Sequence, residues 1–203
     1  MFDLFLREFP PDTPTSFSQE DQRPSLGDQL VFKVVEALGG RSYGGGVYRV
    51  LLSTEIRPWA QRVTLGFPGF EKRITCFGYD WLGRVFTEDS SRLIDGLPGI
   101  VMFEPGSGEA LEIPANILTF HDEELVHYRD AALATEFFQE WLGHGGKSPS
   151  LEECIGYKRP LFLGGKDRVE NLELCDIDVY WHISSQLIRQ ARGLPEGAKI
   201  NMR

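Results

Sequence analysis

Four short apolar-rich stretches, joined in pairs by turns, are the feature that most restricts how this chain can fold. RITCFGYD and RVFTED flank one turn, and GIVMFEP and EALEIP flank Gly106-Ser107-Gly108. Strands separated by only a few residues pair as antiparallel neighbours, because a parallel pair needs a long crossover connection. The segment from 73 to 114 therefore predicts two β-hairpins in an antiparallel sheet.

Amphipathic helices are predicted on both sides of these hairpins. In each of them, apolar residues recur every three or four positions, and glycine follows three of the four patterns. The expected helices cover residues 26–38, 54–63, 125–141 and 177–191. Hairpins flanked by helices predict an α+β fold, with a central antiparallel sheet packed by amphipathic helices that include a long C-terminal helix.

The length of 203 residues fits one domain with a small appendage. Residues 1–25 are predicted to be an N-terminal segment and linker, because PPDTPTSFSQEDQRPS is rich in Pro, Ser and Thr. The first nine residues can form a short helix held on the core by Phe and Leu side chains. Residues 26–203 are predicted to be a single α+β domain.

No catalytic or cofactor motif is present. GGRSYGGG at 39–46 lacks the G-x-x-x-x-G-K-[ST] pattern of a phosphate loop, so it predicts a flexible connection before a strand at 47–52. The sequence also lacks a nucleophile elbow, a dinucleotide fingerprint and HExxH. The four histidines are scattered without the spacing of metal ligands. We therefore expect no catalytic residues, no metal and no cofactor.

The overall charge argues against nucleic acid as a direct ligand. The formal net charge is −9 and the pI is about 5.0, whereas DNA and RNA binders need a basic surface that displaces counterions. MFDLFLREFPPDTP does not read as a signal peptide, and no stretch approaches the ~20 apolar residues of a membrane span. Cys76, Cys154 and Cys175 are widely spaced and predict buried free thiols. These features predict a cytoplasmic protein with no membrane partner, and they indicate no oligomeric state.

Acidic residues are concentrated in one part of the chain. The window from Glu104 to Glu140 holds nine acidic residues and one basic residue, Arg129, for a net charge of −8. A second acidic group lies between Asp167 and Asp178. Such a run can be a solvated face, or it can attract a basic partner and speed its encounter. The sequence leaves both interpretations open.

His121 precedes the carboxylates of Asp122, Glu123 and Glu124. Acidic side chains in the first turn of a helix complement its dipole and can accept from free backbone N–H groups. We therefore favour a capping role for this run over metal binding or acid–base catalysis.

The stretch GYDWLGR at 78–84 fits either a tight turn or a ligand site. Asp80 suits the first position of a type I turn and Gly83 the fourth, with Tyr79 and Arg84 as a cross-strand pair. Trp81 would then lie at the tip, either folded back on the core or held for a partner. A turn is the favoured interpretation. The alternative is an enzyme or small-molecule binder in which Tyr79, Asp80, Trp81 and Arg84 form a cluster.

Strand alternation also predicts where neighbouring side chains point. It places Cys76 and Gly78 on one face of the sheet and Phe77 and Tyr79 on the other.

Three blocks of sequence carry a resemblance to a known family. GYDWLGRVFTED, LEIP with FHDEELV, and GYKRPLFLGGKD with ENLELCDIDVYW follow one another in this order. Together they resemble a bacterial immunity-protein family that includes proteins protecting a cell from its own type VI secretion DNase toxin. The blocks span about 73–199, and the family is similar in character to the SUKH immunity superfamily. The resemblance implies an α+β fold and supplies no catalytic residues.

The resemblance and the local acidity together predict a non-catalytic binding protein. Its expected partner is a cognate protein toxin, a nuclease with a basic DNA-binding groove, which it would block with an acidic surface. A general protein-interaction module is the other alternative. The candidate contact residues are Glu104, Glu109, Glu112, Asp122, Glu123 and Glu124, with Trp81 as an aromatic anchor.

Overall fold

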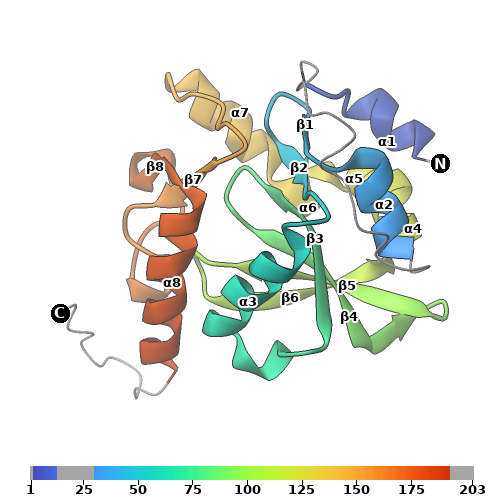
Figure 1. The fold of residues 1–203 in the computed structure, drawn as a ribbon. Coiled ribbons are helices and arrows are strands. Elements are labelled where there is room, and N and C mark those ends of the chain that lie inside the picture. The colour runs from blue at the N-terminus through green and yellow to red at the C-terminus, as the bar shows by residue number, and fades with distance from the viewer. Residues whose placement is uncertain (1, 13–29, 193–203) are drawn as a thin grey trace.

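A six-stranded antiparallel sheet forms the middle of the protein, as the computed structural model of residues 2–12 and 30–192 shows (Figure 1). Each strand is hydrogen-bonded to the one before it in the sequence, in the order β1-β2-β3-β4-β5-β6. The strands are β1 (Arg41–Tyr43), β2 (Tyr48–Val50), β3 (Ile74–Asp80), β4 (Val85–Ile94), β5 (Leu97–Glu104) and β6 (Glu109–Asn116). The predicted α+β class and antiparallel sheet are confirmed.

Helices cover both faces of this sheet (Figure 1). They are α1 (Asp3–Glu8), α2 (Leu30–Leu38), α3 (Ile56–Gly66), α4 (Ile117–Thr119), a π-helical turn η3 (Phe120–Glu124), α5 (Leu125–His127), α6 (Arg129–Leu133), α7 (Thr135–Gly143) and α8 (Ile177–Ala191). Short 3-10 turns lie at η2 (Pro68–Phe70), η4 (Leu161–Leu163) and η5 (Val169–Asn171). The result is an α+β fold in three layers.

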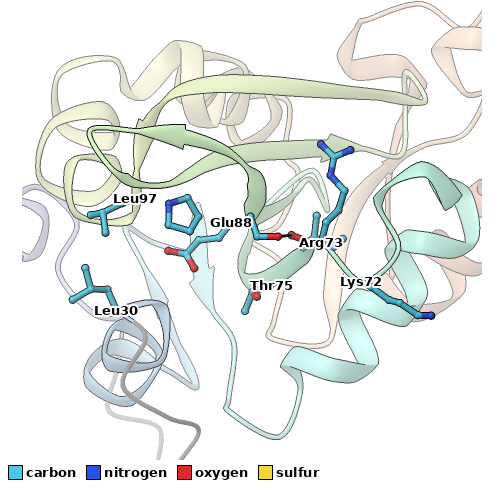
Figure 2. A pocket seen from close by; sticks show the side chains of 9 residues that line it. Leu30, Lys72, Arg73, Thr75, Glu88 and Leu97 are labelled. Carbon is cyan, nitrogen blue, oxygen red and sulfur yellow. Dashed lines mark hydrogen bonds between the residues drawn. The ribbon is translucent and has the colours of Figure 1, made fainter.

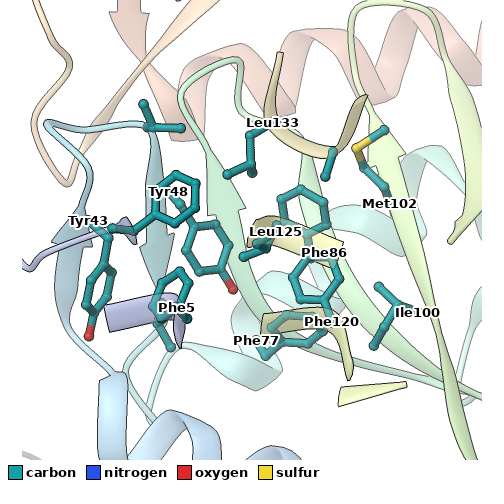
Figure 3. Packing of buried hydrophobic residues seen from close by; sticks show 14 of the residues in the cluster. Phe5, Tyr43, Tyr48, Phe77, Phe86, Ile100, Met102, Phe120, Leu125 and Leu133 are labelled. Atoms are coloured by element: carbon teal, nitrogen blue, oxygen red, sulfur yellow. The ribbon is translucent and has the colours of Figure 1, made fainter. Parts of the chain in front are cut away.

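Each face of the sheet contributes to its own apolar cluster. On one face, α3 and α8 meet through Trp59 and Trp181, whose ring centroids lie 6.3 Å apart. On the other face, Phe5 of α1, Phe77 of β3 and Phe120 of η3 are fully buried together (Figure 3). α1 therefore packs on the same core as the sheet. Residues 13–29, which contain most of the predicted linker, lie outside the described residues.

The helix predictions hold best where packing and capping agree. α8 covers the predicted residues 177–191, and Asp176 Oδ1 accepts from Val179 N at 2.9 Å to cap it. α2 is described from Leu30, so the predicted start at Leu26 is outside the described residues. The predicted helix at 125–141 is broken into three. Tyr128, at φ −122° and ψ 30°, separates α5 from α6, and Ala134, with a left-handed φ of 49° that an α-helix cannot contain, separates α6 from α7.

Two strands, β7 and β1, were not predicted from the sequence. β7 (Glu153–Tyr157) pairs with β8 (Leu172–Asp176) in a separate two-stranded sheet, and only β8 was expected. The segment 39–46 is not a flexible connection, because β1 lies within it and pairs with β2. Its turn is fixed by Asp12, whose carboxylate accepts from the backbone N of Gly45 at 2.6 Å and of Gly46 at 2.8 Å.

A bulge in β3 corrects the predicted alternation. The register shifts between Cys76 and Gly78, so Tyr79 lies on the α3–α8 face with Cys76, whereas Phe77 points to the other face. Gly78 permits the close approach of β2, since a Cβ there would lie 2.7 Å from the Tyr48 hydroxyl. Tyr79 stacks on Trp59 as a result, with ring centroids 5.3 Å apart.

The β3–β4 connection is the predicted turn, closed by a buried ion pair. Gly83 N donates to Asp80 O at 3.0 Å, and Asp80 Oδ1 accepts from the backbone N of Leu82 at 3.0 Å and of Arg84 at 2.9 Å. Arg84 Nε donates to Asp80 Oδ2 at 2.6 Å. Arg84 thus pairs with Asp80, whereas Tyr79 faces Val85 in the register, so the expected Tyr79–Arg84 pair is wrong.

We predict that Asp80→Asn destabilises the protein by about 3–5 kcal/mol, because it leaves the Arg84 guanidinium buried without its counter-charge. Asp95→Asn, the same change at the exposed β4–β5 turn, should alter stability by less than about 0.5 kcal/mol. Urea unfolding of the two variants measures the difference. Equal stabilities would contradict a structural role for the pair.

His121 is buried among aromatic rings in η3. Its side chain is 0% exposed, its Nε2 lies 3.1 Å from the Tyr48 hydroxyl, and its Nδ1 lies 3.4 Å from Ile117 O. Burial lowers the pKa of His121 to about 4. The imidazole is therefore neutral at pH 7 and serves as a hydrogen-bonded core residue.

We predict that protonation of His121 destabilises the protein in acid. The unfolded chain binds the proton near pH 6.5 and the folded chain near pH 4, so this contribution to stability is complete above pH 6.5 and is lost as the pH falls. The loss should be on the order of 2–3 kcal/mol. His121→Gln should have a flatter dependence between pH 7 and pH 4.5, measured by urea unfolding at each pH. Parallel pH profiles would contradict this.

Candidate functional site

The acidic residues of the 104–140 run do not form one continuous patch. Glu104 and Glu109 face each other at the β5–β6 turn, whereas Asp122, Glu123 and Glu124 follow the far end of β6. β6 spans 8 residues, which at about 3.3 Å per residue separates the two groups by roughly 20 Å or more. The run therefore provides two separate acidic regions.

The candidate acids also differ in exposure. Glu109, Glu112 and Glu123 are exposed, whereas Glu104, Asp122 and Glu124 are half-buried. Burial raises the pKa of Glu104, and the nearby positive charge of Arg84 opposes this shift. The exposed acids are the ones that can face a partner without rearrangement.

Alternation along the edge strand separates two of these acids. Ile113 of β6 packs with the α1 side of the sheet, and Ala110 packs with the α8 side. Glu109 therefore lies on the α1 side, and Glu112 lies on the α8 side. Glu112 has an oxygen 3.6 Å from Arg92 Nε.

The predicted capping role of the acidic run is correct in kind but applies to a different helix. Asp122 Oδ1 accepts from Phe5 N at 3.0 Å, so it satisfies a free N–H at the start of α1. The helix that the run itself follows, α4, is capped by Asn116, which accepts from Leu118 N at 2.9 Å and Thr119 N at 3.2 Å. Asp122 thus attaches α1 to the domain.

Trp81 is not a surface anchor. Its side chain is 0% exposed, and its Nε1 donates to Leu133 O at 2.8 Å. The indole packs between Phe137 and Phe138 of α7, with ring centroids 5.7 and 5.0 Å away. The tip of the turn is folded back into the core, because a buried indole gains apolar contact and keeps its hydrogen bond.

The Tyr79–Asp80–Trp81–Arg84 cluster does not converge on a cavity. Asp80 and Trp81 are fully buried, and Arg84 Nη2 donates to Ala132 O at 3.1 Å. Tyr79 lines a cavity of about 330 Å³ beside α3 and α8, but its hydroxyl donates to Leu151 O. The four side chains hold the turn together, which removes the geometry that an enzyme or ligand site in this stretch would need.

No group of three or more His, Cys, Asp or Glu side chains within residues 2–12 and 30–192 is arranged to hold a metal ion. Among the same residues, no helix has the length and apolar character to cross a membrane. Cys154 and Cys175 are brought together by the β7–β8 pair, with free thiols whose sulfur atoms lie 3.7 Å apart. Cys76 is buried separately.

A cavity that the sequence analysis missed lies between α2 and the start of β5 (Figure 2). Its volume is about 460 Å³, and Glu88 of β4 projects into it beside Leu30 and Leu97. Glu88 is 6% exposed, and burial raises its pKa to about 7. The signal was in RVFTED: Phe86 faces the core, so alternation directs a carboxylate inward at Glu88.

Comparison with solved structures supports the fold over nearly the whole chain. The protein described as "Crystal structure of Atu4351 from Agrobacterium tumefaciens" is similar with a TM-score of 0.60 and 17% sequence identity. The match covers 92% of this chain and 89% of that chain. At this identity the likeness shows a shared fold alone. No curated protein matches this sequence.

A family match covers the C-terminal part of the chain. Residues 122–188 match the family described as "T6SS immunity protein Tdi1, C-terminal", a narrower range than the expected 73–199. The matched segment runs from η3 through β7 and β8 into α8. The likeness to the SUKH superfamily stays a prediction. The resemblance to a type VI secretion immunity family is thereby confirmed, and over residues 122–188 this chain is similar to the T6SS immunity protein Tdi1 family.

Proposed function

We propose that this protein is an immunity protein that binds a cognate type VI secretion toxin and blocks it without catalysis. The observation that carries the proposal is the match of residues 122–188 to the T6SS immunity family. The matched segment contains α5, α6, α7, the β7–β8 pair and most of α8 (Figure 1).

The use of the polar side chains supports binding over chemistry. Asp80 and Arg84 are committed to each other inside a turn. His121 is neutral in the core, and Asp122 caps α1. Each of these groups has a structural partner, so none is left to act as an acid, base or nucleophile at an open site.

The exposed acids favour a basic toxin, for which we propose a nuclease. A nuclease presents a positively charged groove to DNA, and a carboxylate-rich surface can occupy that groove and steer the encounter. Such a meeting would occur in the cytoplasm, where a nuclease toxin reaches its DNA. The proposed acids outside the family match are Glu109 and Glu112, with half-buried Glu104; inside it, exposed Glu123 joins half-buried Asp122 and Glu124.

A second group of exposed side chains lies in the matched segment itself. Glu173, Asp176 and Asp178 are exposed around the start of α8. Val179 and Ile183, one helical turn apart, are 55% and 50% exposed on α8. Apolar side chains next to charged ones are typical of protein-binding surfaces, so we include the outer side of α8 in the proposed contact surface.

We predict that co-expression with the toxin encoded by the neighbouring gene restores growth, and that the two proteins elute together in size-exclusion chromatography. Growth arrest without a complex would overturn the immunity function. A stable complex with a protein other than a toxin, and no toxin gene nearby, would favour a general interaction module instead.

We also predict that the exposed acids speed association. Replacing Glu109, Glu112 and Glu123 by Gln should lower the association rate constant by about tenfold at low salt, with the difference shrinking as salt screens the charges. Stopped-flow binding at several salt concentrations measures this rate.

The matched control removes the same number of charges at exposed positions elsewhere. Glu36→Gln, Glu71→Gln and Asp95→Asn are combined in one variant, which should associate nearly as fast as the unmodified protein. If both triple variants slow association equally, only net charge matters and the proposed acidic surface is wrong.

A further inference from the structure

The cavity beside α2 is built around one carboxylate. The register aligns Thr75 of β3, Glu88 of β4 and Ile100 of β5 in one row across the sheet, on the face that α2 covers. The cavity of about 460 Å³ opens above this row. Figure 2 shows the Glu88 carboxylate lying between Leu30 and Leu97.

Glu88 lacks the partners that neighbouring buried acids have. Asp80 is paired with Arg84, and Asp89 accepts from Arg73 Nε at 2.8 Å and from Ser91 N at 3.0 Å. Among the described residues, no hydrogen bond or ion pair satisfies the Glu88 carboxylate, which is 6% exposed. A buried ionised carboxylate is costly unless something pairs with it.

The basic residues that line the cavity do not supply that pair. Arg73 is bonded to Asp89, and its side chain extends away from Glu88, as does that of Lys72 (Figure 2). In the part of the chain that the structure describes, Lys72 and Arg73 are the basic residues that line the cavity, and nearby Arg92 donates to Ile100 O and, at 3.0 Å, to Ile113 O. Among the described residues, none therefore supplies a cation opposite Glu88.

The shape and chemistry of the cavity define what fits. Leu30, Leu97 and Pro98 form apolar walls, and Glu88 provides a negative charge between them, beside the Thr75 hydroxyl. A lysine or arginine side chain is complementary to this cavity, because its aliphatic stem can pack on the apolar walls and its charged end can pair with the carboxylate. An anion would be repelled, and a neutral apolar group would leave the carboxylate unpaired.

We infer that the Glu88 cavity receives a lysine or arginine side chain of the toxin. This inference rests on the proposed function, because it takes the toxin as the partner and adds the side chain that it inserts. A basic DNA-binding toxin offers such side chains at the surface that an inhibitor must cover. The cavity then supplies a specific contact in addition to the long-range attraction of the exposed acids.

Pairing with a cation must keep Glu88 ionised. Burial raises the pKa of this carboxyl to about 7 in the free protein, and a bound ammonium group lowers it again. Binding should therefore strengthen as the pH rises through 7 and should release protons below that pH. The hydrogen bond to the Asp89 carboxylate raises the pKa of Arg73, so this guanidinium does not produce the same dependence.

The first experiment tests the cavity alone, with n-butylammonium as a mimic of a lysine side chain and butan-1-ol as the neutral control. The probe should lower the apparent pKa of Glu88, followed by the NMR signal of its carboxyl carbon, by one unit or more, and butan-1-ol should not. Probe-induced shifts around Leu30 and Leu97 should disappear in Glu88→Gln. Shifts that persist in Glu88→Gln, or no shifts in the unmodified protein, would overturn the inference.

The second experiment measures toxin binding by calorimetry. Glu88→Gln should raise the Kd by tenfold or more and remove the rise in affinity between pH 6 and pH 8. Glu36→Gln, the same change at an exposed position of α2, should alter the Kd less than twofold. Matching thermal unfolding of both variants at pH 6 would establish that they are folded.

The outcomes separate the two proposals. If the unmodified protein binds the toxin and Glu88→Gln binds equally well, the cavity inference is wrong and the immunity function stands. If the unmodified protein does not bind the toxin at all, the immunity function fails, whatever n-butylammonium does.

Discussion

The rest of the structure depends on the turn between β3 and β4. The buried Asp80–Arg84 pair fixes its backbone, and three parts of the molecule are hydrogen-bonded to it. Trp81 Nε1 donates to Leu133 O of α6, and Trp81 O accepts from Ile155 N of β7 at 2.7 Å. Gly83 O accepts from Trp181 Nε1 of α8 at 2.7 Å. Both helical layers and the second sheet are thus positioned by one short stretch of chain.

Local patterns were predictable from the sequence, and distant contacts were not. The hairpins and α8 follow from turn residues, apolar spacing and a cap, all read within one element. The burial of Trp81 depends on Leu133, which is 52 residues away in the sequence. β7 was missed because its partner strand lies beyond the η4 and η5 turns. Only tertiary packing distinguishes a tip tryptophan in the core from one held for a partner.

The candidate site was likewise predictable only in part. The acidic bias of the 104–140 run was visible in the sequence, but its division into two regions follows from the length of β6. Asp122 looked like a cap for its own helix, and its partner turned out to be Phe5 N, 117 residues away. Glu88 carried a readable signal, because an inward position next to Phe86 holds a carboxylate. The structure was needed to see that no described residue pairs with it, because that depends on the placement of β3, β5 and α2.

A protein that binds one toxin needs both fast association and selectivity for that toxin. Different carboxylates can serve these two needs. Exposed acids such as Glu109 and Glu123 act over long range, but water and salt screen them, so they contribute little selectivity. A carboxylate that is already desolvated acts only at contact, and it rewards a cation that fits its cavity while rejecting a neutral group or an anion. Burying Glu88 without a partner destabilises the free protein. Pairing with a cation in the complex offsets this penalty, which adds to the binding free energy. Among the described residues Glu88 has no partner, and under the proposed function the toxin supplies the cation that completes the pair.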